Sequence, residues 1–256
     1  MQLNDTKALI TGGASGLGLA CAEYFVAAGG KVCLLDVNAD NGNAAVEKLG
    51  ADNACFVQAD VSSESEIEAA CQKAYDFNGG LNVAINCAGV LSAGRVLGRE
   101  APMALDYFNL AIQVNLVGSF NVIKAAANLM QNNTADDDGQ RGVVINTASV
   151  AAFEGQIGQA AYSASKGGIV GMTLPIAREL TRCGIRIMTI APGVFMTPMV
   201  SGMPDHVKEA LAAGVPFPKR LGEPEEFAKT AAHIIENTYL NGSVIRLDGA
   251  IRLEPK

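Results

Sequence analysis

The sequence has few of the side chains from which metal and hydrolytic sites are usually built. Only two histidines occur, His206 and His233, so a three-histidine metal site cannot form. None of the six cysteines belongs to a C-x-x-C pair, and no G-x-S-x-G nucleophile motif is present. These absences argue against a disulfide scaffold and a serine hydrolase. We expect reduced cysteines and no metal site.

Long apolar runs and an excess of basic charge are also missing. No stretch of about 18 apolar residues occurs, so the sequence indicates no membrane span. The 19 lysines and arginines are outnumbered by 26 aspartates and glutamates, and a net charge of −7 has the wrong sign for a nucleic-acid binder. The N-terminus has neither the basic patch nor the apolar segment of a leader. We therefore expect a bacterial cytoplasmic protein, or a processed protein of the mitochondrial matrix.

The sequence does contain a regular alternation of strand-like and helix-like segments. Its 256 residues, 49% of them hydrophobic, suit one α/β domain with a large core. The expected strands are 7–11, 31–36, 54–58, 82–86, 142–148, 185–191 and 243–247. The expected helices are 16–28, 39–49, 64–78, 103–131, 160–182, 205–212 and 224–236. This order predicts, over residues 1–256, one Rossmann-type, doubly wound parallel sheet of about seven strands with helices on both faces.

Residues 7–36 have the pattern of a dinucleotide-binding βαβ unit. An apolar strand leads into a glycine-rich turn from Gly12 to Gly18, and a helix and a second strand then lead to Asp36. The glycines allow close approach to a pyrophosphate, and the helix N-terminus offers free N–H groups to that anion. Asp36 lies near the spacing of roughly 20 residues at which an acid holds the adenosine ribose. Because a carboxylate there repels a 2′-phosphate, the sequence predicts NAD rather than NADP.

A second motif, Tyr162-x-x-x-Lys166, follows the expected strand 142–148, and Ser149 lies at the end of that strand. Positions i and i+4 share one face of a helix, so the phenol and the ammonium would lie side by side. The ammonium favours the phenolate, and we expect the pKa of Tyr162 to fall toward the working pH. Such a phenol can exchange a proton with an alcohol. Taken alone, the spacing also fits an unrelated surface tyrosine and lysine.

Together these motifs resemble the short-chain dehydrogenase/reductase family over nearly the whole chain. The residues that carry the resemblance are Thr11-Gly12 through Gly18, Asp60-Val61, Asn86-Cys87-Ala88-Gly89, Asn115, Ser149, Tyr162, Lys166 and Pro192-Gly193. Cys87 departs from the asparagine common at that place in the family. Segments 149–156, 215–218 and 244–252 are similar to the branch of the family that oxidises 3-hydroxyacyl-CoA thioesters and tolerates hydroxysteroids. The resemblance implies this substrate class.

The resemblance implies a reaction, NAD-dependent oxidation of a secondary alcohol to a ketone, and a role for each catalytic residue. Tyr162 would be the general base, and Lys166 would lower its pKa and bond the nicotinamide ribose. Ser149 would donate a hydrogen bond to the substrate oxygen. Asn115 would hold a water that links Lys166 to solvent, or it is a helix asparagine satisfied by the backbone. Ser149 and Tyr162 would bind the substrate.

The resemblance also implies a cofactor site, a lid and an assembly. The expected cofactor-binding residues are Gly12, Ser15, Gly16, Leu17, Gly18, Asp36, Asp60, Val61, Cys87, Ala88, Gly89, Tyr162, Lys166, Pro192, Gly193, Phe195 and Thr197. Residues 194–219 would cover the substrate as a lid. The methionines in this segment would form either a pliable apolar wall or ordinary core. Members of the family are commonly tetrameric, so the likeness implies a homotetramer built on helices 103–131 and 160–182 and the tail after Gly242.

Two other functions fit part of the sequence. A 3-oxoacyl-carrier-protein reductase or a hydroxysteroid dehydrogenase would share these motifs, although Asp36 disfavours the NADPH that the usual reductase employs. A dinucleotide-sensing scaffold would keep the glycine loop and perform no chemistry. Such a scaffold has no need of Ser149, Tyr162, Lys166 and Asn115 together.

Overall fold

Seven strands form one sheet in the order β3-β2-β1-β4-β5-β6-β7 in the computed structural model, which describes residues 1–255. The strands are β1 (Lys7–Thr11), β2 (Lys31–Asp36), β3 (Ala54–Gln58), β4 (Val83–Asn86), β5 (Gly142–Thr147), β6 (Ile185–Pro192) and β7 (Val244–Leu247). Every neighbouring pair is parallel. The predicted Rossmann-type fold class is therefore confirmed.

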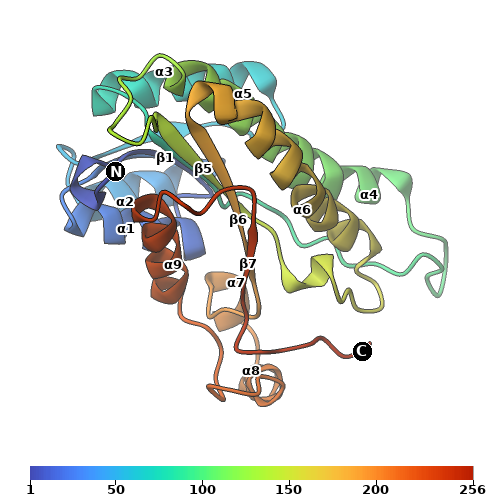
Figure 1. Cartoon of the computed structure of the whole chain (residues 1–256). Helices are drawn as coiled ribbons and strands as arrows, with labels where there is room; N and C mark the ends of the chain where they lie inside the picture. Colours follow the sequence, from blue (N-terminus) through green and yellow to red (C-terminus); the bar gives the residue numbers. More distant parts are fainter. Residues whose placement is uncertain (256) are drawn as a thin grey trace.

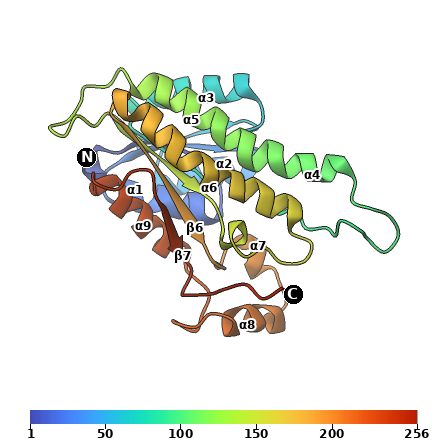
Figure 2. The ribbon, with the colours of Figure 1, turned by 45° about the vertical axis from the view of Figure 1, so that its right-hand side comes forward.

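Helices cover both faces of the sheet, as Figures 1 and 2 show. One face packs against α1 (Gly16–Ala27), α2 (Ala39–Leu49) and α9 (Pro224–Glu236). The other face packs against α3 (Glu64–Asn78), α5 (Gly118–Met130) and α6 (Ala160–Leu180). The remaining elements are α4 (Leu105–Ala111), α7 (Pro198–Ser201), α8 (Asp205–Ala213), η1 (Leu3–Asp5), η2 (Ile112–Val117), η3 (Val150–Ala152) and η4 (Thr181–Cys183).

The central strands are continuous apolar runs because both of their faces are covered. In β1, Ala8 and Ile10 pack on the side of α1, whereas Leu9 packs on the side of α3. Successive side chains of a strand point to opposite faces, so a strand between two helical layers must be apolar at every position. The run Lys-Ala-Leu-Ile-Thr has this composition, and the strand occupies the position that its sequence predicts.

The expected helix 103–131 differs from the structure in one physical respect. It begins at Leu105, and a π-helical segment, η2, interrupts it between α4 and α5. The N–H of Gly118 donates to the carbonyl of Gln113, five residues back, which is the wider π-type turn. The hydroxyl of Ser119 also donates to the carbonyl of Asn115 at 2.7 Å. The local widening places Asn115 inside the protein, where it is fully buried.

The same helical stretch, Leu105–Met130, is long and apolar enough to cross a membrane on length and composition alone. In the protein, 56% of its most apolar 18-residue window is buried. It lies beside α3 and α6 over the sheet in both views (Figures 1 and 2). Burial of this kind is typical of a helix that covers a sheet.

The strand order creates a crevice at one edge of the sheet. The chain winds outward from β1 to β3 in one direction and from β4 to β7 in the other, so the order reverses between β1 and β4. In such sheets the loops after these two strands diverge and leave a ligand-binding crevice at their carboxyl ends. Thr11 and Asn86 are paired at these two strand ends. The glycine loop follows directly after Thr11.

Candidate active site

A cavity of about 670 Å³ lies at the carboxyl ends of the strands. It is lined by Gly12, Ser15, Gly16, Leu17, Gly18, Asp36, Asp60, Val61, Cys87, Ala88, Gly89, Ser149, Tyr162, Lys166, Pro192, Gly193, Phe195 and Thr197, among others. These are all of the residues expected to bind cofactor or substrate. The crevice therefore brings the glycine loop and the Tyr162–Lys166 motif into one space, although they are far apart in the sequence.

The glycine loop is shaped for close backbone approach. Gly12 has a φ of +62°, and a Cβ on it would lie 2.8 Å from the backbone nitrogen of Ala88. A Cβ on Gly18 would lie 2.3 Å from the carbonyl oxygen of Gly12. Neither position leaves room for a side chain, so the first turn of α1 can lie directly against the loop. This cradle at a helix N-terminus fits the pyrophosphate of a dinucleotide.

Asp36 ends β2 on the wall of the cavity. One carboxylate oxygen accepts the N–H of Ala14 at 3.3 Å, and the other accepts the N–H of Asn38 at 3.1 Å. These backbone bonds fix the direction of the carboxylate. Among the described residues that line the cavity, Lys166 has the only basic side chain. The Asp36 end of the cavity therefore offers a fixed negative charge to a ligand.

Ser149 precedes η3, the 3₁₀ turn at the end of β5. Its hydroxyl oxygen accepts the N–H of Ala151 at 3.1 Å. With the oxygen held by the backbone, the hydroxyl proton is free to be donated into the cavity. The hydroxyl of Ser149 also lies close enough to the phenol of Tyr162 to lower the pKa of that group. The serine and the tyrosine therefore meet at one point of the site.

Tyr162 and Lys166 lie in the first turns of α6, as their spacing predicts. The Nζ of Lys166 lies 5.8 Å from the centre of the Tyr162 ring. It donates a hydrogen bond to the carbonyl of Thr147 at 2.7 Å, and the side chain is buried. Thr147 is the last residue of β5, so this bond fixes α6 against the strand that leads to Ser149.

The expected lowering of the Tyr162 pKa is wrong for this structure. Burial raises the pKa of Tyr162, and the neighbouring hydroxyl of Ser149 offsets this only in part. Burial also lowers the pKa of Lys166 to about 8, against the opposing influence of the Cys87 thiol. The sequence spacing correctly placed the ammonium beside the phenol. It did not account for desolvation, which favours the neutral form of both groups.

Asn115 lies behind the cavity wall and is not one of its described lining residues. Its side chain accepts the N–H of Val90 at 2.8 Å and donates to the carbonyl of Val90 at 3.0 Å. It also donates to the hydroxyl of Ser165 at 2.9 Å, and that hydroxyl donates to the carbonyl of Tyr162 at 2.7 Å. Asn115 thus ties the loop after β4 to the helix that carries Tyr162.

Sequence reasoning missed two residues that organise this region. Ser165 connects Asn115 to the backbone of Tyr162, and Thr147 supplies the acceptor for Lys166. Ser165 directly precedes Lys166, so its position next to the motif was a usable signal. Thr147 binds Lys166 through its backbone carbonyl, which no side-chain pattern can reveal.

Residues 194–219 form two short helices, α7 and α8, beyond the end of β6 (Figure 1). Val194, Pro198 and Val200 line the cavity. Met196 and Met203 are not among the described lining residues, and the side chain of Met199 lies outside the described part of the structure. The apolar wall on this side therefore consists of the two valines, the proline and Phe195 rather than of the two described methionines.

The structure also bears on the thiols and on metal binding. All six cysteines are free, and Cys87 lies on the cavity wall with its sulfur 3.5 Å from the hydroxyl of Thr147. Within residues 1–255, no group of three or more His, Cys, Asp or Glu side chains is placed to hold a metal ion. The chemical groups gathered in this cavity are therefore hydroxyls, a phenol, an amine, a thiol and the two carboxylates of Asp36 and Asp60.

Known proteins resemble this chain over nearly its full length. The family model described as short chain dehydrogenase matches residues 6–208. The chain is 56% identical over 250 residues to the Bos taurus 3-hydroxyacyl-CoA dehydrogenase type-2, covering 97% of this chain and 95% of that protein. It is 51% identical to the Drosophila melanogaster protein of the same name, covering 99% and 100%. The crystal structure of 3-hydroxyacyl-CoA dehydrogenase type-2 from Mycobacterium avium matches with a TM-score of 0.92 at 40% identity, covering 97% and 96%.

Proposed function

This chain belongs to the short-chain dehydrogenase family and is an oxidoreductase, and we propose that it oxidises the hydroxyl group of 3-hydroxyacyl-CoA thioesters with NAD as cofactor. The observation that carries the proposal is that one cavity holds Ser149, Tyr162 and Lys166 against the glycine loop. The substrate class is supported by the names of relatives that are 51% and 56% identical over nearly the whole chain. These names do not favour a carrier-protein reductase or a scaffold.

In the proposed reaction, the hydride would pass to the cofactor, and side chains of the protein would take up the proton and stabilise the substrate oxygen. A bound NAD would supply the carbon that accepts hydride from the alcohol carbon. Tyr162 takes the hydroxyl proton of the substrate and returns it in the reverse reaction. Ser149 donates a hydrogen bond to the same substrate oxygen, which stabilises the charge that develops there. Lys166 holds positive charge beside the phenol. Asn115 holds α6 and the loop after β4 in fixed positions relative to each other.

The choice of NAD over NADP is supported by the fixed carboxylate of Asp36 on the cavity wall. We expect Asp36→Ala to reduce the ratio of kcat/KM for NAD to that for NADP by about 10-fold or more, since a repulsive charge is removed. Initial rates with each cofactor at fixed substrate measure the ratio. Asp60→Ala is a control at a second acid that lines the cavity, and an unchanged ratio in Asp36→Ala would contradict the assignment.

A substrate panel tests the reaction directly. With NAD, we expect turnover of 3-hydroxybutyryl-CoA and 2-methyl-3-hydroxybutyryl-CoA, and slower turnover of a hydroxysteroid. The competing assay uses an acetoacetyl carrier-protein thioester with NADPH. Faster turnover in that assay than of acetoacetyl-CoA with NADH would replace the proposal with the carrier-protein reductase. Cofactor binding without turnover of any alcohol would favour the scaffold.

The lid, the assembly and the compartment belong to the same proposal. Residues 194–219 are proposed to cover the substrate, since five of them, Val194, Phe195, Thr197, Pro198 and Val200, line the cavity beside Gly193. A homotetramer is supported by apolar side chains that remain exposed on α4, α5 and α6. The six free thiols fit a reducing compartment such as the cytoplasm.

A further inference from the structure

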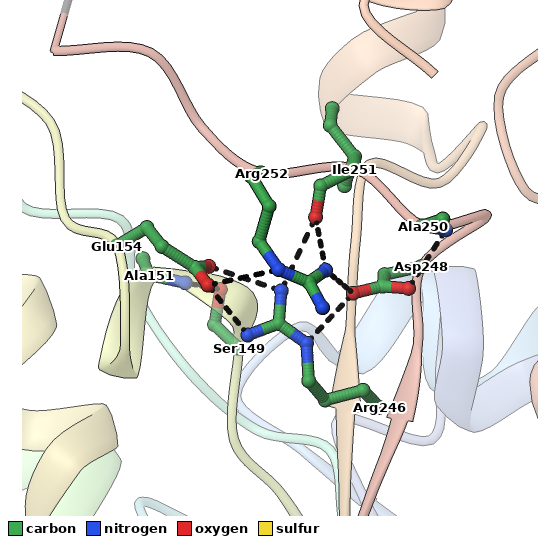
Figure 3. A network of polar contacts seen from close by, with 8 residues as sticks. All are labelled: Ser149, Ala151, Glu154, Arg246, Asp248, Ala250, Ile251 and Arg252. Carbon is green, nitrogen blue, oxygen red and sulfur yellow. Dashed lines mark hydrogen bonds and ion pairs between the residues drawn. The ribbon is translucent and has the colours of Figure 1, made fainter. Parts of the chain in front are cut away.

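A network of charged side chains joins the end of β7 to the turn that follows Ser149 (Figure 3). Arg246 donates two hydrogen bonds to the carboxylate of Glu154, at 2.8 and 3.0 Å. The same guanidinium donates to Asp248 at 2.8 Å and lies 5.1 Å from the ring centre of Phe153. Phe153 and Glu154 directly follow η3. One side chain therefore contacts both residues at the end of this turn.

The turn itself determines how the Ser149 hydroxyl is held. Its oxygen accepts from the N–H of Ala151, and the carbonyl of Ser149 accepts from the N–H of Ala152 at 3.0 Å. At the far end, the N–H of Glu154 donates to the carbonyl of Val150 at 3.0 Å. The turn is a short chain of backbone bonds from Ser149 to Glu154. A shift of its far end would therefore be passed to the serine.

Arg246 is better placed to hold this turn than Arg252, the other arginine of the network. Arg246 makes a bidentate contact with Glu154, and its side chain is 23% exposed. Arg252 is 59% exposed and reaches Glu154 at a single distance of 3.4 Å. A bidentate, largely buried ion pair fixes the relative position of its two side chains, whereas a single exposed ion pair contributes little to stability. Only Arg246 also covers the ring of Phe153.

We propose that Arg246 is a positioning residue, which orients the hydroxyl of Ser149 toward Tyr162 by clamping the turn at Phe153 and Glu154. Arg246 is not among the described residues that line the cavity, so it does not touch the reacting groups. The inference rests on the proposed dehydrogenase function, because a positioned hydroxyl matters only where Tyr162 exchanges a proton. It extends that function to a residue outside the cavity.

The test is Arg246→Met in the full-length protein, with Arg252→Met as the matched control. For Arg246→Met we expect kcat with 3-hydroxybutyryl-CoA to fall by about 10- to 100-fold, since misplacing a catalytic group by about 1 Å costs this much. The dissociation constant of NAD should change little, because the strands β4, β5 and β6 separate β7, which carries Arg246, from β1 and the glycine loop. Arg252→Met should keep kcat within about threefold of the natural enzyme.

A second readout separates positioning from a general loss of structure. The hydroxyl of Ser149 lies near the phenol and lowers the pKa of Tyr162. In Arg246→Met the Ser149 hydroxyl is held less firmly, so it lowers the pKa of Tyr162 less. The phenol should therefore titrate at higher pH. The near-ultraviolet titration of each variant, minus that of the same variant with Tyr162→Phe, isolates this one phenol among the five tyrosines. If Arg246 only stabilised the fold, the pH at which Tyr162 titrates would be the same in Arg246→Met as in the natural protein.

Glu154→Gln tests the same contact from its other side. If Arg246→Met does not fold, Glu154→Gln removes the charge with little change of shape and should show the same loss of kcat and the same titration shift. Unchanged kcat and titration in a folded Arg246→Met or in Glu154→Gln would overturn the positioning role. If the natural enzyme turns over no hydroxyacyl thioester, the proposed function fails. The phenol titration then still decides whether Arg246 orients Ser149.

Discussion

Burial acts on the two members of the Tyr162–Lys166 pair in opposite directions. It raises the pKa of Tyr162 and lowers that of Lys166 to about 8, so each group is pushed toward its neutral form. An enzyme that uses the phenolate of Tyr162 as a base must overcome this effect, because burial favours the protonated phenol. The nearby hydroxyl of Ser149 works against it by lowering the pKa of the phenol. A positively charged ligand in the cavity would work in the same direction.

The raised pKa of Tyr162 predicts the pH dependence of the two reaction directions. Oxidation needs the deprotonated phenol, and reduction needs the protonated one. We therefore expect kcat/KM for oxidation to rise as the pH increases above neutrality, and kcat/KM for reduction to fall. Tyr162→Phe should lose at least about 1,000-fold of kcat while it binds NAD normally, because the proton acceptor is absent. Oxidation that is independent of pH, or a Tyr162→Phe variant that keeps most of its kcat, would contradict this role.

Lys166 should lower the free energy of unfolding of the protein, although turnover requires it. Its pKa in the folded protein, about 8, is below its ordinary value of 10.5, so the unfolded chain binds more protons between these values. Its contribution to stability therefore improves as the pH rises through this range, and the penalty is complete below about pH 8. The difference corresponds to at most about 3 kcal/mol.

Replacement of Lys166 by methionine should remove this penalty. After the loss of the hydrogen bond to Thr147, we expect Lys166→Met to raise the free energy of unfolding near pH 7 by about 1–2 kcal/mol, while turnover is abolished. The difference in free energy of unfolding between Lys166→Met and the natural protein should be smaller near pH 10. Denaturant unfolding of both proteins at the two pH values measures this. A natural enzyme more stable than the variant at neutral pH would argue against a desolvated amine.

At the scale of elements, the junction of the glycine loop and α1 has the least room for change. The Cβ of an alanine at position 18 would lie 2.3 Å from the carbonyl oxygen of Gly12. We expect Gly18→Ala to destabilise the protein by about 1–3 kcal/mol, because the loop must move away from α1. The same movement should weaken NAD binding. Thermal unfolding and a fluorescence titration with NADH measure the two effects.

Gly202 provides the control for this substitution. It ends α7 with a φ of −75°, and an added Cβ would have its nearest neighbour at 3.6 Å, which is ordinary contact. Gly202→Ala should therefore leave both stability and cofactor affinity close to their natural values. If Gly18→Ala behaved like Gly202→Ala, the close approach of α1 to the loop would be incorrect.

At the scale of the whole molecule, the helices α4, α5 and α6 keep large apolar side chains exposed after folding. Leu110 on α4, Phe120 on α5 and Leu174 on α6 are each close to half exposed, and a groove of about 700 Å³ runs between α3, α5 and α6. Exposed apolar side chains that gather on neighbouring helices mark an association surface. The proposed homotetramer would bury this surface.

The assembly is tested by introducing charge on these helices. We expect the natural protein to behave as a tetramer in light scattering, and Phe120→Asp combined with Leu174→Asp to lower its mass to that of a dimer or monomer, since a buried unpaired charge is costly. Leu97→Asp, on the exposed loop before α4, is the control and should stay tetrameric. A natural protein that is monomeric at micromolar concentration would refute the assembly.

Most elements were predictable because their signals are local. Helices 39–49, 64–78 and 224–236 begin and end at the expected residues, where the chain places Asn38, Ser63 and Glu223 directly before the first turns. The helix expected over 103–131 was wrong in detail, because the π-helical segment around Asn115 has no local signature. It forms where the side chain of Asn115 bonds the backbone of Val90, on another loop.

The sequence by itself determined the order of strands and helices, the glycine loop, the position of Asp36 and the spacing of Tyr162 and Lys166. Each of these depends on residues close together in the chain, or on a motif that a family shares. Only the tertiary structure decided the direction of the pKa shifts and the contact of Arg246 with Glu154. Desolvation is produced by groups from many elements, and that contact joins residues 92 positions apart. Neither the packing around a side chain nor its distant partner is encoded in the neighbouring residues.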